Sequence, residues 1–291
     1  MFFGKKEVEK KESPFSVVVV GVSPLAFYLA AVLQEKGVDV VVKVSSEQLK
    51  KYGKEKNIVV KYSGKLKENV LLHFTDKLDK DVDYCLVASL PKDVKNDFML
   101  LVDDVIKKTK IINLSSCLNA KYFENNEILS PFSAFFDGWF AKGETVYSLN
   151  TLNNITICCD DDLFTEMKKL FFETNIVLCK GDDAFLCRKS AEMIVTGLLM
   201  MFYEKSISTV VCDKKELGKI ELAIKEVCEK LFEENKRIEA KKILQSLYDI
   251  PNDARCDFDR KTFLAKINES LEISSIKTPC VYEMISKIIK I

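Results

Sequence analysis

The stretch "VVVVGVSPLAFYLAAVLQEKG", residues 17–37, carries the pattern that decides the fold. A run of four valines is typical of a strand buried on both faces of a parallel sheet. Gly21 and Pro24 interrupt the apolar run where a strand would end, and an apolar segment with helix-forming residues follows. The stretch therefore predicts a strand, a sharp turn and a helix.

The turn has the spacing of the G-x-G-x-x-G fingerprint for a dinucleotide pyrophosphate, but only the first glycine is present. Gly21 keeps the position that allows the tight turn. Ser23 stands at the second position, where its hydroxyl can bond a phosphate oxygen, and Ala26 stands at the third, where alanine also occurs. The helix that follows offers its N-terminal amides to an anion. The turn alone leaves three interpretations: a dinucleotide site with substitutions, the remains of one, or a strand-turn-helix with one glycine.

The end of the next predicted strand, 38–44, bears on the choice of cofactor. A site for NAD usually has an acidic residue about 20 residues after the first glycine, where it bonds the ribose 2′-hydroxyl. This chain has Lys43 there, followed by Ser45 and Ser46. A cation with neighbouring hydroxyls suits a 2′-phosphate, so the sequence favours NADP. The alternative is that Lys43 is an ordinary surface lysine in a lysine-rich chain.

Strand-like and helical segments alternate along the first 180 residues. Strand-like runs lie at 38–44, 57–63, 70–76, 82–89, 110–116 and 175–180, and helical segments include 91–109 and 161–173. Such alternation indicates a parallel sheet with helices packed on it. Beyond Asp182 every periodic segment has helical spacing. We therefore predict an α/β protein with a solvated head (1–13), a Rossmann-type parallel-sheet domain (14–180) and an all-helical domain (181–291).

The composition argues against several classes of protein. Lysine plus arginine equals aspartate plus glutamate, 44 each, and the two signs are mixed, so we expect no nucleic-acid partner. The ten cysteines include no C-x-x-C and the chain has one histidine, so a zinc site is not expected. Scattered cysteines in apolar stretches are typical of a reducing compartment, and we expect a cytoplasmic protein. Gly21 and Pro24 break the apolar stretch 15–34, so we expect no membrane span.

The later chain resembles a known family in two places. "NIVLCKGDDAFLCRKSAEMIVTGLL" (175–199) resembles the junction of ketopantoate reductases (2-dehydropantoate 2-reductases), where a last strand leads into a helix with a catalytic lysine. Here "CRKS" supplies Lys189. "SSIKTPCVYEMISKIIK" (274–290) resembles the family's closing stretch, and counting back from it puts Asp259 where a substrate-binding glutamate is expected. The order of domains also matches, so the resemblance covers nearly the whole chain.

The resemblance implies an NADPH-dependent reduction of a 2-keto acid to a 2-hydroxy acid. It implies that Lys189 stabilises charge on the carbonyl oxygen and donates the proton. It also implies that Asp259 holds a distal hydroxyl of the substrate and that Ser115 lies near the cofactor, where the family has an asparagine. The expected partners are a small 2-keto acid and a second copy of the chain in a homodimer. The alternative for Lys189 is an ordinary ion pair with Glu192, three residues on.

The chain departs from the family at several positions. Met193 and Gly197 stand where the family has asparagines, and Leu90 stands where it has a lysine. The bulkier "PFSAFF" (131–136) replaces a motif that starts with glycine. These departures suggest an altered, more apolar substrate, or an inactive relative that serves as a nucleotide-binding or protein-interaction module. A third interpretation is a reductase of the same architecture that acts on an imine or a hydroxy acid.

Overall fold

The computed structural model places most of the chain from residue 15 onward. The described residues are 15–61, 68–78, 81–89, 97, 100–101, 109–114, 132–138, 140–141, 146–148, 152–252, 254 and 260–290. The predicted head, 1–13, lies outside them, as does most of the helix predicted at 91–109.

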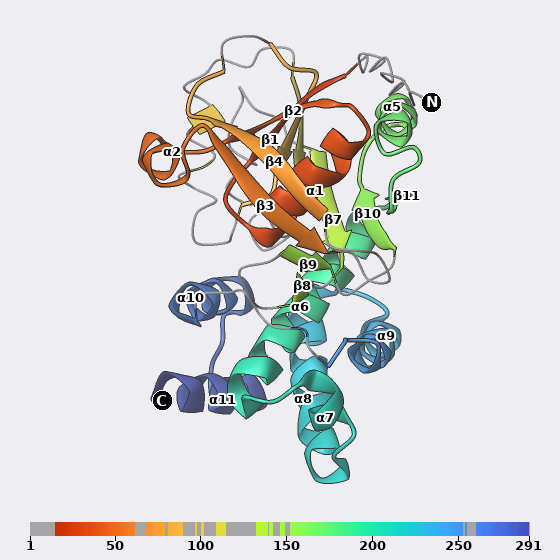
Figure 1. The fold of residues 1–291 in the computed structure, drawn as a ribbon. Helices are drawn as coiled ribbons and strands as arrows, with labels where there is room; N and C mark the ends of the chain where they lie inside the picture. Colours follow the sequence, from red (N-terminus) through yellow and green to blue (C-terminus); the bar gives the residue numbers. More distant parts are fainter. Residues whose placement is uncertain are drawn as a thin grey trace, which may run out of the picture.

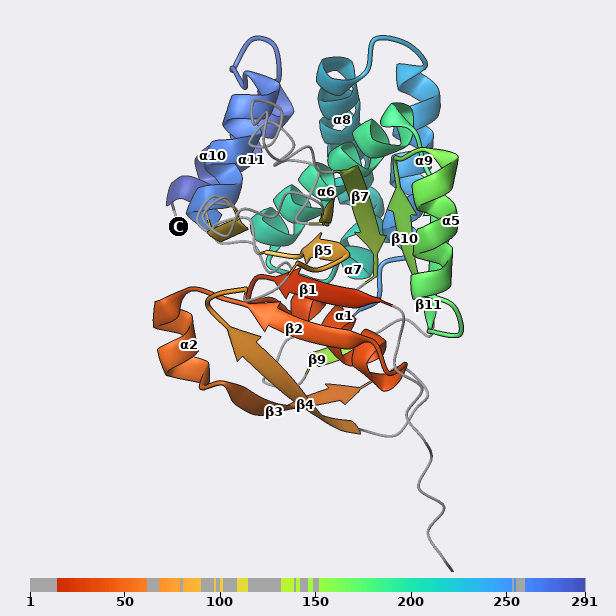
Figure 2. The ribbon, with the colours of Figure 1, turned by 90° about the horizontal axis from the view of Figure 1, so that it is seen from above.

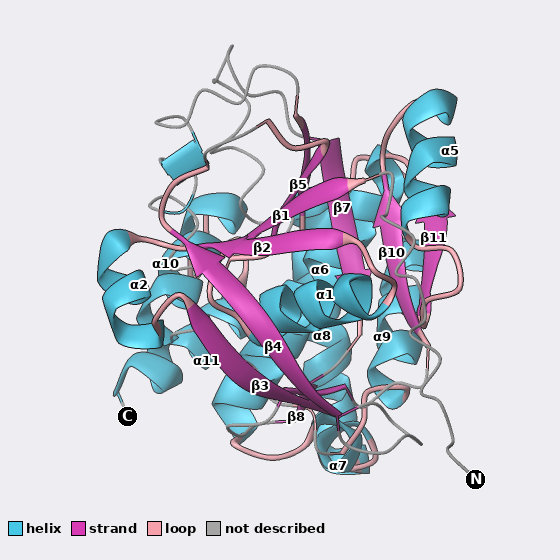
Figure 3. Ribbon diagram, turned by 45° about the horizontal axis from the view of Figure 1, so that its top comes forward, coloured by secondary structure: helices cyan, strands magenta, loops and turns pink. Residues whose placement is uncertain are grey.

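One sheet runs through the first part of the chain (Figure 3). Within the described residues it has eleven strands in the order β11-β10-β7-β6-β5-β1-β2-β4-β3-β9-β8. The strands are β1 Ser16–Val20, β2 Asp39–Lys43, β3 Glu55–Lys61, β4 Glu68–Thr75, β5 Tyr84–Val87, β6 Lys110–Asn113, β7 Phe132–Asp137, β8 Phe140–Ala141, β9 Val146–Ser148, β10 Asn153–Ile157 and β11 Ile176–Lys180. The central strands β7, β6, β5, β1, β2 and β4 are parallel. The strand order reverses at β1, and in open α/β sheets the ligand crevice lies outside the carboxyl ends of the strands at such a point.

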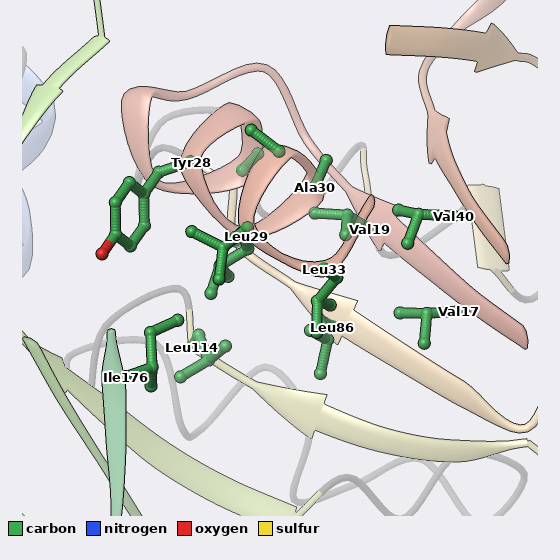
Figure 4. Close-up of a cluster of buried hydrophobic side chains, with 14 of the residues drawn as sticks. Val17, Val19, Tyr28, Leu29, Ala30, Leu33, Val40, Leu86, Leu114 and Ile176 are labelled. Atoms are coloured by element: carbon green, nitrogen blue, oxygen red, sulfur yellow. The ribbon is translucent and has the colours of Figure 1, made fainter. Parts of the chain in front are cut away.

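The opening strand and helix pack on each other as their sequence predicts. Helix α1, Pro24–Glu35, begins with Ser23 as its N-cap and Pro24 in its first turn, where the missing N–H costs nothing. Figure 4 shows Leu29 and Leu33 of α1 directed at the sheet, where Val17 of β1 and Leu86 of β5 meet them. Each such side chain contributes about 1.5–3 kcal/mol by leaving water. The alternate β1 valines point to the other face, into a separate buried cluster.

The chain after β11 is helical and has a core of its own (Figures 1 and 2). Its helices are α6 Asp183–Tyr203, α7 Ile207–Val211, α8 Lys214–Leu231, α9 Lys236–Tyr248, α10 Arg260–Leu271 and α11 Pro279–Lys290. Helix α6 leaves the sheet and runs through the middle of this part, where α8, α9 and α11 contact it. The buried carboxylate of Glu226 in α8 accepts hydrogen bonds from the first amides of α11, those of Cys280 and Val281.

The predicted fold class is confirmed, with one refinement. Strand β3 runs antiparallel to β4, and β10 runs antiparallel to β7, so the sheet is mostly rather than entirely parallel. Two further helices are α2 Ser46–Tyr52, which contacts β4, and α5 Asp161–Leu170, which contacts the terminal strand β11. Strand β11 ends at Lys180 and α6 begins at Asp183, on either side of the predicted domain boundary. None of the helices in the described part of the chain is both long enough and apolar enough to cross a membrane.

Candidate functional site

The turn after β1 requires glycine at its first position. Gly21 has φ +114°, a conformation that side chains disfavour. A Cβ built on Gly21 would lie 2.8 Å from the Cα of Ser89, just beyond the end of β5. The turn and the end of β5 therefore touch at the point where the strand order reverses. This contact marks the centre of the candidate site.

Ser23 has a different role from the one expected of it. Its side chain is turned inward and is only 4% exposed. The hydroxyl donates to the carbonyl oxygen of Ala88 and accepts from the amide of Ala26, which makes Ser23 the N-cap of α1. Because its single proton is used within the protein, it has none to give a phosphate oxygen. The hydroxymethyl group also does not stand between the turn and an approaching pyrophosphate.

The first turn of α1 still has amides for an anion, but fewer than an unsubstituted fingerprint offers. Pro24 has no N–H, and the amide of Ala26 is bonded by Ser23. The amides of Val22, Ser23 and Leu25 have no partner among the described residues. Three amides at a helix N-terminus suit one phosphate group. The turn thus fits a dinucleotide pyrophosphate through its backbone alone, and Ala26 serves to pack the helix, since it is fully buried.

Lys43 is not at the surface. It is the last residue of β2 and is 1% exposed, and its Nζ donates to the backbone carbonyl of Asp76 at 3.0 Å. A 2′-phosphate could reach this ammonium only if the side chain left its buried position. The carboxylate of Asp76, by contrast, is partly exposed and accepts from the Ser46 hydroxyl at 2.7 Å. The residue expected to bind the phosphate therefore supports the backbone.

Lys189 lies where α6 meets the sheet. Its Nζ is 3.1 Å from Oδ2 of Asp137, the last residue of β7, and 2.7 Å from Oε2 of Glu192 on its own helix. The ring centroids of Phe135 and Phe185 lie 5.5 Å and 5.7 Å from the same Nζ. The side chain is only 13% exposed. The ion pair with Glu192 that the sequence left open is present, but the lysine is not an ordinary surface residue.

The two charges of this pair affect each other. Burial lowers the pKa of Lys189, but the carboxylates of Glu192 and Asp137 more than offset it, so the pKa is raised overall. Burial also raises the pKa of Glu192, and the Lys189 ammonium opposes that effect. An ammonium with a raised pKa stays protonated at neutral pH. The site thus holds a positively charged proton donor in a largely desolvated position.

Lys189 and Gly21 both lie on the carboxyl side of the sheet. Asp137 is at the carboxyl end of β7, and β7, β6, β5 and β1 are parallel neighbours. Ser133 is in register with the last residues of β6, β5 and β1, so Asp137 and its contact with Lys189 lie four residues beyond the carboxyl ends of those strands. In sheets of this type the carboxyl edge is where ligands bind. The structure brings the predicted catalytic lysine and the predicted cofactor turn to the same carboxyl side of the sheet.

The face of α6 beyond Lys189 is filled by an aromatic ring. A Cβ built on Gly197 would lie 2.2 Å from the ring of Phe263 in α10, and Phe263 is 1% exposed. Gly197 is thus a close-packing position, and an asparagine there would displace the ring. Met193 lies between it and Lys189 on the same helix face. Met193 and Gly197 thus stand where the family has asparagines, and the Phe263 ring occupies the space that an asparagine at 197 would need.

Three of the predicted positions lie outside the described residues: Ser115, Asp259 and Leu90. The sequence reasoning passed over Asp137 and Asp76. Asp137 is 52 residues from Lys189, and no local pattern links the two. Asp76 is the last residue of the strand predicted at 70–76, and the ends of parallel strands present ligand-binding residues, so its signal was present in the sequence.

Comparison with known proteins gives similarity of structure only. No family model matches the chain, and no curated protein matches its sequence. Among solved structures, a dimeric ketopantoate reductase from Staphylococcus aureus aligns with a TM-score of 0.71 at 11% identity, covering 94% of this chain and 98% of its own. A probable 2-dehydropantoate 2-reductase from Bacillus subtilis aligns with a TM-score of 0.70 at 14% identity, covering 94% of this chain and 99% of its own.

A second kind of enzyme aligns equally well. A D-mandelate dehydrogenase solved with NADH and anilino(oxo)acetate gives a TM-score of 0.71 at 10% identity, covering 94% of this chain and 98% of its own. At such identities the likeness concerns the path of the chain, since a fold can serve many functions. It confirms the fold that the resemblance in residues 175–199 and 274–290 implied. The chain has the fold of the ketopantoate reductases.

Proposed function

We propose that the chain binds a nicotinamide dinucleotide and reduces a 2-keto acid to a 2-hydroxy acid, with Lys189 as the general acid. The observation that carries the proposal is the position of the Lys189 ammonium. It is largely desolvated, held by two carboxylates and on the same carboxyl side of the sheet as the Gly21 turn. The names of the structural neighbours, reductases and a dehydrogenase of such acids, support the proposal.

The hydrogen bonds of Lys189 suit this chemistry. An ammonium has three N–H groups, and Asp137 and Glu192 each accept from one. The third N–H has no hydrogen-bond partner among the described residues and is available for the carbonyl oxygen of a substrate. When bound, the dinucleotide supplies a hydride to the carbonyl carbon. The Lys189 ammonium then stabilises the charge that develops on oxygen and gives up a proton to it.

Other parts of the proposal follow from the resemblance and the packing. Asp259 as a substrate anchor and Ser115 near the cofactor remain proposals. The ring of Phe263 on Gly197 favours a substrate other than ketopantoate, with fewer polar groups. A cytoplasmic location and a homodimer are also proposed, and the Staphylococcus aureus reductase is described as dimeric. Lys43, the reason for expecting NADPH, is buried, so the choice between the dinucleotides depends on its neighbours.

A second candidate is a dinucleotide-binding module without turnover. Phe263 and Met193 favour it, because they give the face of α6 beyond Lys189 few groups that could hold a polar substrate. This module would keep the Gly21 turn and bind the dinucleotide. It would not oxidise the reduced form in the presence of any 2-keto acid.

A titration of the full chain with NADH and with NADPH tests the proposal. A ligand that binds only the folded state raises stability by about 2.7 kcal/mol at a hundredfold excess over its Kd. We expect saturable stabilisation by at least one dinucleotide, and oxidation of that dinucleotide with some member of a panel of 2-keto acids. Binding without oxidation would favour the module, and no binding would overturn both candidates.

A pair of glycine variants tests whether the turn is the binding site. Gly21→Ala places a methyl group against Ser89 at a positive φ and should abolish dinucleotide binding. Gly218→Ala is the matched control, since a Cβ there meets nothing within 4 Å. The melting temperature of each variant separates lost binding from lost folding. Equal binding by both variants would place the dinucleotide elsewhere.

A further inference from the structure

The carboxyl ends of β2 and β4 lie side by side and present one carboxylate. Lys43 pairs in register with Thr75, and the amide of Val44 donates to the Thr75 carbonyl at 2.9 Å. Asp76 follows Thr75 directly. Figure 2 shows α2 next to the ends of these two strands. Asp76 thus stands one strand away from the usual place of a ribose-binding acid.

The buried lysine fixes the position of Asp76. The Lys43 ammonium donates to the Asp76 backbone carbonyl at 3.0 Å, from below the surface. The Ser46 hydroxyl donates to Oδ2 of the same residue at 2.7 Å. One residue is therefore held through both its main chain and its side chain. Such double support gives a binding group a defined direction.

The charge of this carboxylate is also secured. The hydrogen bond from Ser46 lowers the pKa of Asp76 and outweighs desolvation, which raises it. A hydrogen bond from the Asp76 backbone amide and the charges of Lys77 and Lys43 lower the pKa further. Asp76 is therefore ionised at neutral pH. A carboxylate has about four acceptor sites, so beside its bonds from Ser46 and from its own amide it can accept from a further hydroxyl. A partly exposed, ionised carboxylate with acceptor sites left is a group that accepts from ribose hydroxyls.

From this arrangement we infer that Asp76 selects NADH over NADPH. The inference rests on the proposed dinucleotide site. At the second strand of such a site, the ribose of the adenosine half lies close to the strand end. The carboxylate accepts from the 2′-hydroxyl of NADH, whereas it repels the charged 2′-phosphate of NADPH. The ammonium that would attract the phosphate is buried and bonded to a carbonyl oxygen.

The experiment compares Kd values for NADH and NADPH, measured by calorimetry on the full chain and on Asp76→Asn. We expect the wild type to bind NADH at least tenfold more tightly. In Asp76→Asn the two Kd values should differ by less than threefold, mainly because NADPH binds more tightly. The backbone carbonyl that Lys43 bonds is unchanged by this substitution, and the asparagine side-chain oxygen can still accept from Ser46. Asp161→Asn, which removes an exposed carboxylate on α5, is the matched control and should leave the ratio unchanged.

Each other outcome has a definite meaning. Equal or tighter binding of NADPH by the wild type would overturn the inference while leaving the dinucleotide site in place. An undiminished NADH preference in Asp76→Asn would show that another group selects the cofactor. Absence of binding of both dinucleotides by the wild type would overturn the proposed function itself, and this inference with it.

Discussion

Lys43 and Lys189 both lie on the side of the sheet where the parallel strands end, yet their ammonium groups have different surroundings. The ammonium of Lys43 is 1% exposed and bonds a backbone carbonyl below the turn. The ammonium of Lys189 bonds two carboxylates where α6 meets β7 and keeps a third N–H. Lys43 is the last residue of β2, and Lys189 lies in α6 against the last residue of β7. The difference shows that a lysine near a strand end becomes a candidate for binding only when its ammonium remains within reach of a ligand.

This comparison also explains how charge is distributed along the site. At the proposed adenosine end the Lys43 ammonium is buried and the carboxylate of Asp76 is partly exposed, whereas at the proposed substrate end the Lys189 ammonium itself faces the ligand. The ribose hydroxyls of NADH need a hydrogen-bond acceptor, whereas the reacting carbonyl needs a proton donor. The two lysines therefore separate a structural role from a chemical one, and substituting each of them tests that separation.

Replacing Lys189 should have the largest effect. We expect Lys189→Ala to lower kcat by about 10²- to 10⁴-fold, because the proton donor and the oxyanion partner are lost together. The Kd for the dinucleotide should change by less than about threefold, since Lys189 is not at the Gly21 turn. Steady-state kinetics and calorimetry on the same preparation measure the two quantities.

Two further variants sharpen this result. Lys180→Ala removes a lysine that pairs with exposed Asp161, and it should leave kcat unchanged. Lys189→Arg keeps the positive charge but cannot give up a proton, so it should remain slow. An arginine variant with wild-type kcat would exclude the general-acid role. Equal losses of kcat and dinucleotide affinity in Lys189→Ala would exclude it too.

Replacing Lys43 should affect the fold rather than the chemistry. Lys43→Ala empties a buried position and releases the Asp76 carbonyl, at a cost of about 2–4 kcal/mol in the free energy of unfolding. Urea denaturation measures this loss, and Lys36→Ala, at an exposed ion pair with Glu173, should cost less than about 0.5 kcal/mol. A stable Lys43→Ala variant that discriminates against NADPH more strongly than the wild type would instead make Lys43 a cofactor-binding residue.

The fold could be predicted because burial requires a characteristic pattern of apolar residues in each strand and helix. The valines of β1 and β2 are apolar on both faces, as parallel strands under helices must be, and the predicted strand 38–44 agrees with Asp39–Lys43. The change to helical spacing after Asp182 agrees with α6. These patterns are local, so one sequence is enough to identify them.

The direction of a single side chain is not a local property. Whether Lys43 points to solvent or to the interior depends on the Asp76 carbonyl, 33 residues away. The partner Asp137 of Lys189 and the ring of Phe263 on Gly197 are also contributed by distant segments. The pairing of Glu192 with Lys189 could be predicted from the sequence, because residues three positions apart in a helix are neighbours on its surface. Candidate site residues could be located along the sequence, but their partners required the packed structure.

The pH dependence of stability tests the pairing at Lys189 without any substrate. In Lys189→Met the buried Glu192 loses the ammonium that opposes the rise of its pKa. The folded variant then binds a proton that the unfolded chain has released, so its free energy of unfolding falls as pH rises above the ordinary pKa of glutamate. We expect the difference in free energy of unfolding between wild type and variant to be about 1 kcal/mol larger at pH 8 than at pH 4.5. Denaturant titrations at the two pH values measure this, and adding Glu192→Gln should remove the difference. A deficit independent of pH would mean that Glu192 does not depend on Lys189, and the two lysines would then differ only in exposure.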